Sequence, residues 1–326
     1  MKKILGIGNA LVDIMIRIDN DEILHRFDLP KGSMQMVDNI KSSEVKKGTV
    51  KFRSSLSSGG SAANTIHGLG MLGLETSFIG SVGKDDTGDF FEKDMRQAGV
   101  NTRLIRRETV TGTAIALVSP DSERTFATHL GAATELNPED LRPEYFKGYD
   151  ILYMEGYLIF NRPLVEKACQ MAKSHNLKVV VDLASYNVVE AKIEDFREIV
   201  TKYVDILFAN EEEARAYTGK GPEEALEDLA ETCETVIIKT GSKGSVIKRG
   251  EEYIKVGTIK VKPKDTTGAG DLYASGFLYG YAMNYPLDVC GQIGSLLAGK
   301  VIETLGAKMS DKKWENIKAR IEKIIS

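Results

Sequence analysis

Short runs of apolar residues, many of them β-branched, alternate with amphipathic stretches along most of this 326-residue chain. The runs expected to form strands are residues 3–7, 76–82, 151–153, 178–182, 206–209 and 235–240. Helical patterns lie between them at residues 90–98, 164–174 and 223–232, and residues 269–325 are largely helical in pattern. This alternation is typical of a parallel sheet covered by helices on both faces. The sequence therefore predicts a doubly wound α/β fold with a mostly parallel sheet.

Two segments depart from this alternation and predict a second, smaller sheet. Every second residue from Val12 to Ile18 is a valine or isoleucine, which is the period of a strand with one buried face. Residues 111–118 and 124–129 have the pattern of a hairpin that turns at Pro120 and Asp121. We expect a small antiparallel β-sheet lid, formed by segments of about residues 12–52 and 108–130, on a single domain that spans residues 1–326.

Composition excludes several classes of protein. The chain has 43 Lys and Arg against 47 Asp and Glu, a formal net charge of -4 that disfavours a general nucleic-acid binder. It has no apolar run near the roughly 18 residues that a membrane span requires. The three cysteines lie far apart and outside any CxxC pair, which argues against a disulfide framework and a zinc knuckle. A reducing cytoplasm is the expected location.

The most informative segment is DTTGAGD at residues 265–271, which opens a helical pattern. Thr266 or Thr267 can cap the helix, and Gly268 to Gly270 let its free N–H groups approach a ligand, which makes a natural anion site. Asp271 lies on the first turn, where a carboxylate could take the proton of a hydroxyl that attacks a phosphoryl group. The same residues also suit an ordinary helix start in which Asp271 serves only the helix dipole.

Two further groups of residues could bind hydroxyl groups. Gly59, Gly60 and Asn64 belong to the segment SSGGSAAN, which opens a helix and offers N–H groups and an amide side chain to a polar ligand. Asn9 and Asp13 follow the first strand, at the sheet edge where open α/β proteins place their ligands, and could hold a vicinal diol. A flexible loop, a helix cap or a turn would explain the same residues.

Two segments near strand ends suit a nucleotide and its metal. Asn210 and Glu213 could hold a magnesium ion through its waters, but they are also good capping residues. Thr240, Gly241 and Gly244 end the strand of residues 235–240, where they could contact a nucleotide or form a tight turn.

Other nucleotide and metal motifs are absent from the sequence. There is no GxxxxGK[ST] loop. A GxGxxG pattern occurs at Gly68, Gly70 and Gly73, but it follows a helical pattern and precedes a strand, the reverse of the order that a dinucleotide site needs. The four histidines form no metal-binding pattern.

The chain resembles the ribokinase-like family of sugar and nucleoside kinases, also called the PfkB carbohydrate kinase family, in residues 58–64, 210–213 and 265–271. The resemblance extends over nearly the whole chain, and DTTGAGD is its most specific part. It implies a doubly wound domain with a β lid, MgATP as phosphoryl donor and the primary hydroxyl of a sugar moiety as acceptor.

The resemblance also implies roles for single residues. Asp271 matches the catalytic base, with Gly268, Ala269 and Gly270 as its anion hole, and Arg124 matches a lid arginine that closes toward the transferred phosphoryl group. The positions that match acceptor-binding residues are Asn9, Asp13, Gly59, Gly60 and Asn64. Those that match the nucleotide and magnesium site are Asn210, Glu213, Thr240, Gly241 and Gly244, with Mg²⁺ held by Asn210 and Glu213 through water. Many relatives bind K⁺ where this chain has Asp265, Thr267, Gly306 and Ser310.

The opening GNALVDI, the segment TGTAIALV and Glu155-Gly156-Tyr157 are most similar to the adenosine kinase branch. Tyr157 could stack on a purine, beside an apolar wall of Leu11, Met34 and Met36. Residues 62–63, two alanines, depart from that branch and leave a free sugar such as ribose, fructose or ketodeoxygluconate open as acceptor.

We therefore expect an ATP-dependent kinase that phosphorylates a ribose-bearing acceptor, adenosine or a related nucleoside first and a free sugar second. The alternatives from other classes are a non-catalytic sugar or nucleotide sensor and a dinucleotide-dependent oxidoreductase. The expected partners are small molecules, with neither nucleic acid nor membrane, and the chain would be a monomer or a homodimer paired through the lid.

Overall fold

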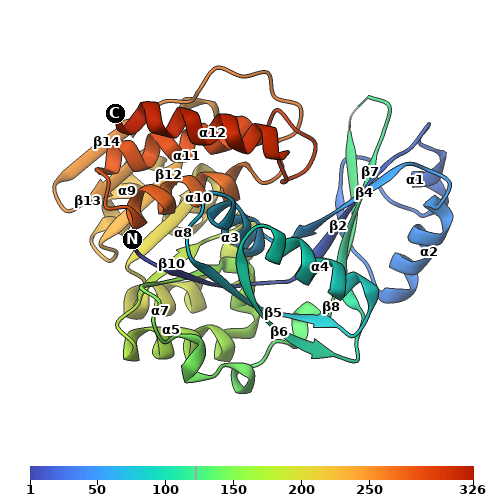
Figure 1. Ribbon diagram of the computed structural model, residues 1–326, viewed down its shortest axis with the longest axis horizontal. Coiled ribbons are helices and arrows are strands. Elements are labelled where there is room, and N and C mark those ends of the chain that lie inside the picture. Colours follow the sequence, from blue (N-terminus) through green and yellow to red (C-terminus); the bar gives the residue numbers. More distant parts are fainter. Residues whose placement is uncertain (122) are drawn as a thin grey trace.

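The computed structural model describes residues 1–121 and 123–326, and its largest element is a nine-stranded sheet (Figure 1). The strand order is β14-β13-β12-β11-β10-β9-β1-β5-β6, and the strands from β12 to β6 pair in parallel. Their bounds are β1 Ile4–Ile7, β5 Thr76–Gly83, β6 Val100–Arg107, β9 Ile151–Glu155, β10 Lys178–Asp182, β11 Ile206–Asn210, β12 Thr235–Lys239, β13 Ser245–Arg249 and β14 Glu252–Val256. The predicted doubly wound α/β fold is confirmed.

Three strands of this sheet, β6, β13 and β14, are missing from the sequence prediction. They lie at the two edges of the sheet, and β13 and β14 pair with their neighbours in antiparallel fashion. An edge strand buries only part of its surface, so charged residues interrupt its apolar run, as in VNTRLIRR of β6. The apolar-run criterion finds the fully buried central strands and misses such edges.

Helices cover both faces of the main sheet. On one face lie α3 Ser61–Met71, α4 Asp86–Gln97 and α10 Ala269–Ala282, with α11 Leu287–Val301 and α12 Asp311–Ile325 packed on α10 and on one another. On the other face lie α5 Arg162–Ser174, α6 Tyr186–Ala191, α7 Ile193–Tyr203, α8 Glu211–Thr218 and α9 Pro222–Ala230. Short 3-10 turns connect several of these elements: η1 Ala132–Glu135, η2 Pro138–Asp140, η3 Pro143–Tyr145, η4 Gly156–Asn161 and η5 Gly241–Lys243.

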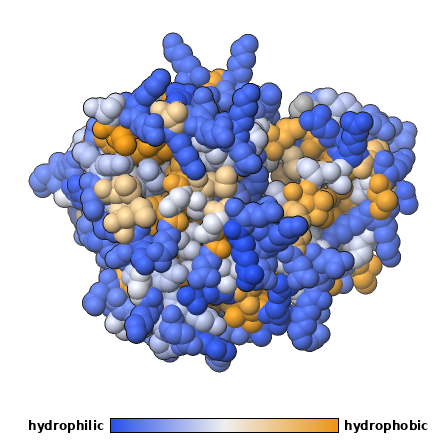
Figure 2. Space-filling model, in the orientation of Figure 1, coloured by the Kyte–Doolittle hydropathy of each residue, from blue (hydrophilic) through white to orange (hydrophobic). Residues whose placement is uncertain are grey.

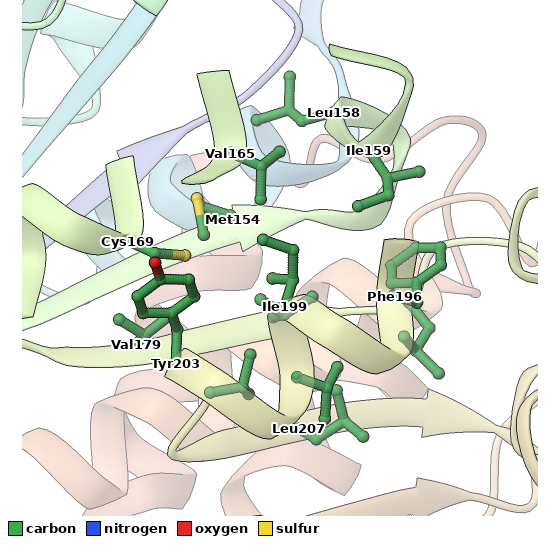
Figure 3. Close-up of a cluster of buried hydrophobic side chains, with 14 of the residues drawn as sticks. Met154, Leu158, Ile159, Val165, Cys169, Val179, Phe196, Ile199, Tyr203 and Leu207 are labelled. Carbon is green, nitrogen blue, oxygen red and sulfur yellow. The ribbon is translucent and has the colours of Figure 1, made fainter. Parts of the chain in front are cut away.

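Central strands such as β1, β9 and β10 are apolar on both faces except at their ends, because both faces are buried. In β1, Ile4 belongs to the core under α3 and α10, while Leu5 and Ile7 belong to the core under α5 and α7. Figure 3 shows part of the second core, where Met154 of β9 and Leu207 of β11 lie against side chains from α5 and α7.

A second sheet of five strands lies beside the main body (Figure 1). Its order is β3-β8-β7-β2-β4, with bounds β2 Leu11–Arg17, β3 Met34–Met36, β4 Ser54–Gly59, β7 Thr111–Val118 and β8 Arg124–Gly131. Its core joins the strands to α1 Glu22–Arg26 and α2 Asn39–Thr49 through residues such as Ile16, Leu24, Val45 and Leu117.

The expectation of a purely antiparallel small sheet is wrong, because β2 pairs with β7 and β3 with β8 in parallel. The sheet also extends past the predicted segments to β4, at residues 54–59. The sequence of β4, SSLSSG, has no apolar pattern, so only its pairing with β2 makes it a strand.

This architecture brings several chain segments to one edge of the main sheet. The carboxyl ends of β1, β9, β10, β11 and β12 share that edge, because these strands are parallel. The small sheet continues directly from β1 through residues 8–10. Figure 2 shows apolar side chains on the small-sheet lobe, on the right of the view, and in several patches on the main body. Among the described residues, no helix is both long and apolar enough to cross a membrane.

Candidate active site

The start of α10 is shaped by Gly268. Gly268 has a φ of 75°, and a Cβ at this position would lie 2.6 Å from the Cβ of Ala307. The predicted threonine cap is wrong: Gly268 occupies the cap position, and within the described residues no side chain caps the helix. Instead, the carboxylate of Asp265 accepts a hydrogen bond from the Thr267 N–H at 2.7 Å and fixes the turn. The first N–H groups of α10 therefore stay free of a side-chain cap at the positive end of the helix dipole.

Asp271, on the first turn of α10, is held by the facing helix α3. Ser61 donates a hydrogen bond to its Oδ1 at 2.7 Å, and the Asn64 amide donates to its Oδ2 at 2.9 Å. Burial raises the pKa of Asp271 to about 6, although both hydrogen bonds favour the charged form. At neutral pH this carboxylate is therefore ionised, with a proton affinity higher than that of an exposed aspartate.

Glu155, the last residue of β9, joins the segment after β1 to the start of α3. Its carboxylate accepts hydrogen bonds from the Asn9 N–H at 3.0 Å, the Asn9 amide at 2.5 Å and the Ala62 N–H at 2.7 Å. Burial raises its pKa to about 7. Glu155 thus fixes the orientation of Asn9 and the start of α3, although the sequence prediction gave it no role in the site.

Asp13 lies on β2 opposite the glycines that precede α3. A Cβ on Gly59 would lie 2.2 Å from Asp13 Oδ1, and Gly60 has a φ of 98° beside the main-chain oxygen of Asn9. Burial raises the pKa of Asp13 to about 7, and the charge of Asp271 acts in the same direction. The predicted acceptor residues Asn9, Asp13, Gly59, Gly60 and Asn64 are therefore brought together beside Asp271.

Arg124 connects the small sheet to the start of α10. From the first position of β8 its guanidinium pairs with the buried Asp265 and donates to Thr267 Oγ1 at 2.8 Å. The second oxygen of Asp265 accepts a hydrogen bond from the Gly306 N–H at 2.6 Å. The small sheet is thus docked on the edge of the main sheet next to the open N–H groups.

Asn210 and Glu213 form a reciprocal helix cap at the start of α8. The Glu213 carboxylate accepts hydrogen bonds from the N–H and the amide of Asn210, and Asn210 Oδ1 accepts from the Glu213 N–H at 2.8 Å. Burial raises the pKa of Glu213 to about 7. Lys239 lies beside it and donates to Asp182 at 2.7 Å, and a Cβ on Gly270 would lie 3.3 Å from the Lys239 ammonium.

The remaining predicted residues lie at the margins of this edge. Tyr157 is 39% exposed in η4, and after burial the charges of Glu155 and Asp271 contribute to raising its pKa to about 12. Thr240, Gly241 and Gly244 form the turn after β12, where a Cβ on Gly244 would lie 1.9 Å from the main-chain oxygen of Val256. The tight turn alone accounts for Gly244.

Comparison with known proteins identifies the family. The sequence profile described as pfkB family carbohydrate kinase matches residues 35–314. The chain belongs to this family. It is 27% identical to a nucleoside kinase of Methanocaldococcus jannaschii over 327 residues, which cover 99% of this chain and 98% of the relative. It is 29% identical to a 5-dehydro-2-deoxygluconokinase of Bacillus licheniformis over 284 residues, which cover 82% of this chain and 86% of the relative. The crystal structure of adenosine kinase from Sinorhizobium meliloti is 33% identical, covers 98% of this chain and 99% of its own, and has a TM-score of 0.87.

As a pfkB-family kinase, the protein is a phosphotransferase that acts on an alcohol group, and the family uses ATP with a divalent metal. The described residues contain no cluster of three or more His, Cys, Asp or Glu suited to direct metal binding. Asp182 and Glu213 nevertheless place two carboxylates against the single ammonium of Lys239. This excess of negative charge fits a Mg²⁺ ion that keeps most of its waters.

In the predicted potassium site, the side chains of Asp265 and Thr267 already have partners in this structure. Both oxygens of Asp265 already accept hydrogen bonds from main-chain N–H groups, and Arg124 supplies the positive charge beside them. Ser310 is exposed at the start of α12. We therefore assign no step of the reaction to K⁺.

Three functional candidates escaped the sequence prediction: Glu155, Asp182 and Lys239. Each is a charged residue at the end of an otherwise apolar buried strand, as in ILYME, KVVVD and TVIIK. A buried charge needs a partner, and strand ends of a parallel sheet meet at one edge. A charged residue at the end of an apolar strand was therefore the signal in the sequence that could have identified these three residues.

Proposed function

We propose that this kinase transfers the γ-phosphoryl group of ATP to the primary hydroxyl of a ribose-bearing acceptor, adenosine or a related nucleoside. The observation that carries the proposal is the Asp271 carboxylate, which two donors of α3 hold beside the open start of α10. A base and a set of N–H donors at one point are the two components that phosphoryl transfer to an alcohol needs.

In the proposed reaction, Asp271 takes the hydroxyl proton while the acceptor oxygen forms its bond to the γ-phosphorus. The bond between that phosphorus and the bridging oxygen of ATP breaks, and ADP leaves. The N–H groups at the start of α10 and the Arg124 guanidinium stabilise the negative charge on the moving phosphoryl group. When bound, Mg²⁺ would neutralise phosphate charge from its place near Glu213 and Asp182.

The acceptor would lie between the edge of the main sheet and the small sheet, which acts as a lid. Asn9 and Asp13 would bind its secondary hydroxyls, and Glu155 would position Asn9. The Arg124–Asp265 pair would hold the lid closed and exclude water from the reaction.

A nucleoside acceptor is supported by two observations. The proteins that match this chain over almost its full length include a nucleoside kinase and an adenosine kinase. The small sheet also presents Met34 and Met36, which are 63% and 61% exposed, as an apolar surface that suits a base. A sugar kinase of the same family, acting on ribose, fructose or ketodeoxygluconate, is the second candidate because of the gluconokinase relative.

The test is ADP release with MgATP and a panel of adenosine, other nucleosides, ribose, fructose and ketodeoxygluconate. We expect adenosine or another nucleoside to give the highest kcat/KM, and the Asp271→Asn variant to release almost no ADP. If a free sugar is the best acceptor, the second candidate, a sugar kinase, replaces the nucleoside kinase as the proposed function. ADP release that no acceptor raises above the background would contradict the kinase proposal and leave a sugar or nucleotide sensor.

A further inference from the structure

Lys308 lies in the loop between α11 and α12, next in the chain to residues that contact the turn at the start of α10. The Gly306 N–H donates to Asp265, and Ala307 packs so closely on Gly268 that no Cβ fits there. Lys308 follows these two residues in the chain. Lys308 belongs to none of the motifs described above, and no step of the proposed reaction uses it.

The Lys308 ammonium is buried and, among the described residues, has no hydrogen-bond partner. Its charged neighbours come from three elements: Asp94 of α4, Asp13 of β2 and Asp271 of α10. On α3, the buried His67 has its pKa lowered by burial and by the charge of Lys308. Burial lowers the pKa of Lys308 to about 8, so the ammonium is still mostly charged at neutral pH. A buried cation without a partner is costly, which suggests that a ligand supplies the missing acceptor.

Two other unpartnered polar atoms belong to residues that hydrogen-bond two of these carboxylates. Ser58 Oγ and Asn64 Oδ1 are buried without a partner in the described structure. The N–H of Ser58 donates to Asp94 at 2.9 Å, and the Asn64 amide donates to Asp271. The group thus comprises an ammonium donor, an amide acceptor and a hydroxyl. A hydroxyl-bearing ligand matches it, because each hydroxyl can accept from Lys308 and donate to an oxygen.

We propose that Lys308 is a specificity-determining residue, which donates a hydrogen bond to a secondary hydroxyl of the acceptor's sugar ring in a site that favours neutral acceptors. This inference rests on the proposed kinase function. Three carboxylates, those of Asp13, Asp94 and Asp271, act on the single ammonium, so the ligand position already carries an excess of negative charge. An acceptor with a carboxylate would add to that excess, whereas a nucleoside or a neutral sugar would not.

The test compares wild type with Lys308→Met, an unbranched apolar side chain one atom shorter that lacks the ammonium, and Lys308→Gln, which keeps a donor but no charge. Lys312→Met, an exposed lysine on the same segment, is the matched control. KM and kcat are measured for adenosine, 2′-deoxyadenosine and 3′-deoxyadenosine, for ribose and 2-deoxyribose, and for ketodeoxygluconate, with thermal unfolding in parallel.

We expect Lys308→Met to raise the KM of the neutral acceptor about 10- to 100-fold, the loss typical of a charge-assisted hydrogen bond, with a much smaller change in kcat. Wild type should discriminate against the analogue that lacks the contacted hydroxyl, and Lys308→Met should lose that discrimination. Lys308→Gln should restore part of it, and Lys312→Met should match wild type. Because Lys308→Met leaves the neighbouring carboxylates without their cation, its Tm should fall, and the Tm serves only to show that each variant is folded.

A lysine that only balances the neighbouring carboxylates would lower the Tm of Lys308→Met in the same way but would leave the ratio of kcat/KM between hydroxyl and deoxy acceptors unchanged. An unchanged ratio, measured on Lys308→Gln if the methionine variant does not fold, would overturn the proposed role of Lys308 in binding the acceptor. Faster turnover of ketodeoxygluconate than of every neutral acceptor would also overturn it and leave the kinase proposal intact. Absence of turnover with every acceptor would overturn both.

Discussion

Replacing Asp271 by asparagine should remove the activity and, at neutral pH, make the protein more stable. Burial raises the pKa of Asp271 from its usual 3.8 to about 6. A shift of roughly two units corresponds to about 3 kcal/mol by which the folded protein disfavours the ionised carboxylate. Asparagine is the neutral isostere, so Asp271→Asn should raise the free energy of unfolding by up to that amount.

The surrounding residues can accommodate the new amide. Ser61 can still donate its hydroxyl hydrogen to the remaining oxygen. The Asn64 side chain can turn over and offer its unpartnered Oδ1 to the new NH₂ group. We therefore expect no loss of fold to obscure the effect of the charge.

The pH dependence follows from the direction of the shift. The pKa of Asp271 is higher in the folded than in the unfolded state. Its contribution to the stability of wild type is therefore fully present below about pH 4 and is lost as the pH rises through about 6. The difference in the free energy of unfolding between Asp271→Asn and wild type should therefore reach its full size above about pH 7 and vanish below about pH 4. Urea unfolding of both proteins across this range measures it.

Activity is measured as ADP release at saturating acceptor. Loss of a general base typically costs about 10²- to 10⁴-fold in rate, so kcat should fall by that factor. Asp265→Asn is a contrasting control that should destabilise the protein, because its carboxylate accepts two main-chain hydrogen bonds and pairs with Arg124. Asp271→Asn that is less stable than wild type at pH 8, or that keeps kcat within about threefold, would refute the reasoning.

Three further predictions concern the rest of the site. Gly268→Ala should lower the free energy of unfolding by about 2–4 kcal/mol in urea, because this position combines a positive φ with a close contact to Ala307. The control Gly250→Ala, at a position with a positive φ but open space around it, should lower it by about 1 kcal/mol. Glu213→Gln should raise the Mg²⁺ concentration needed for half-maximal ADP release, and an unchanged requirement would leave Glu213 as a helix cap. Arg124→Met should lower kcat about tenfold or more through loss of transition-state stabilisation, and a kcat within about twofold of wild type would limit Arg124 to anchoring the small sheet.

The amino-acid sequence alone was sufficient to predict the class of the fold and the chemistry of the turn before α10. The interior of strands such as β1 and β10 is apolar on both faces because both faces are buried, so their composition identifies them without any partner. In DTTGAGD, Gly268 supplies a backbone conformation and Asp271 a carboxylate within a few residues of one another. Such local features need no long-range contact to be recognised.

Other parts of the structure were decided by tertiary contacts alone. β4 is a strand because β2 offers it hydrogen bonds, and the parallel pairs of the small sheet join segments about 100 residues apart. Glu155 and Lys308 reach the site from β9 and from the loop after α11, far in sequence from Asp271. Their side chains are polar groups whose role depends on which distant atoms surround them, and burial, which sets their pKa values, exists only once the chain has folded.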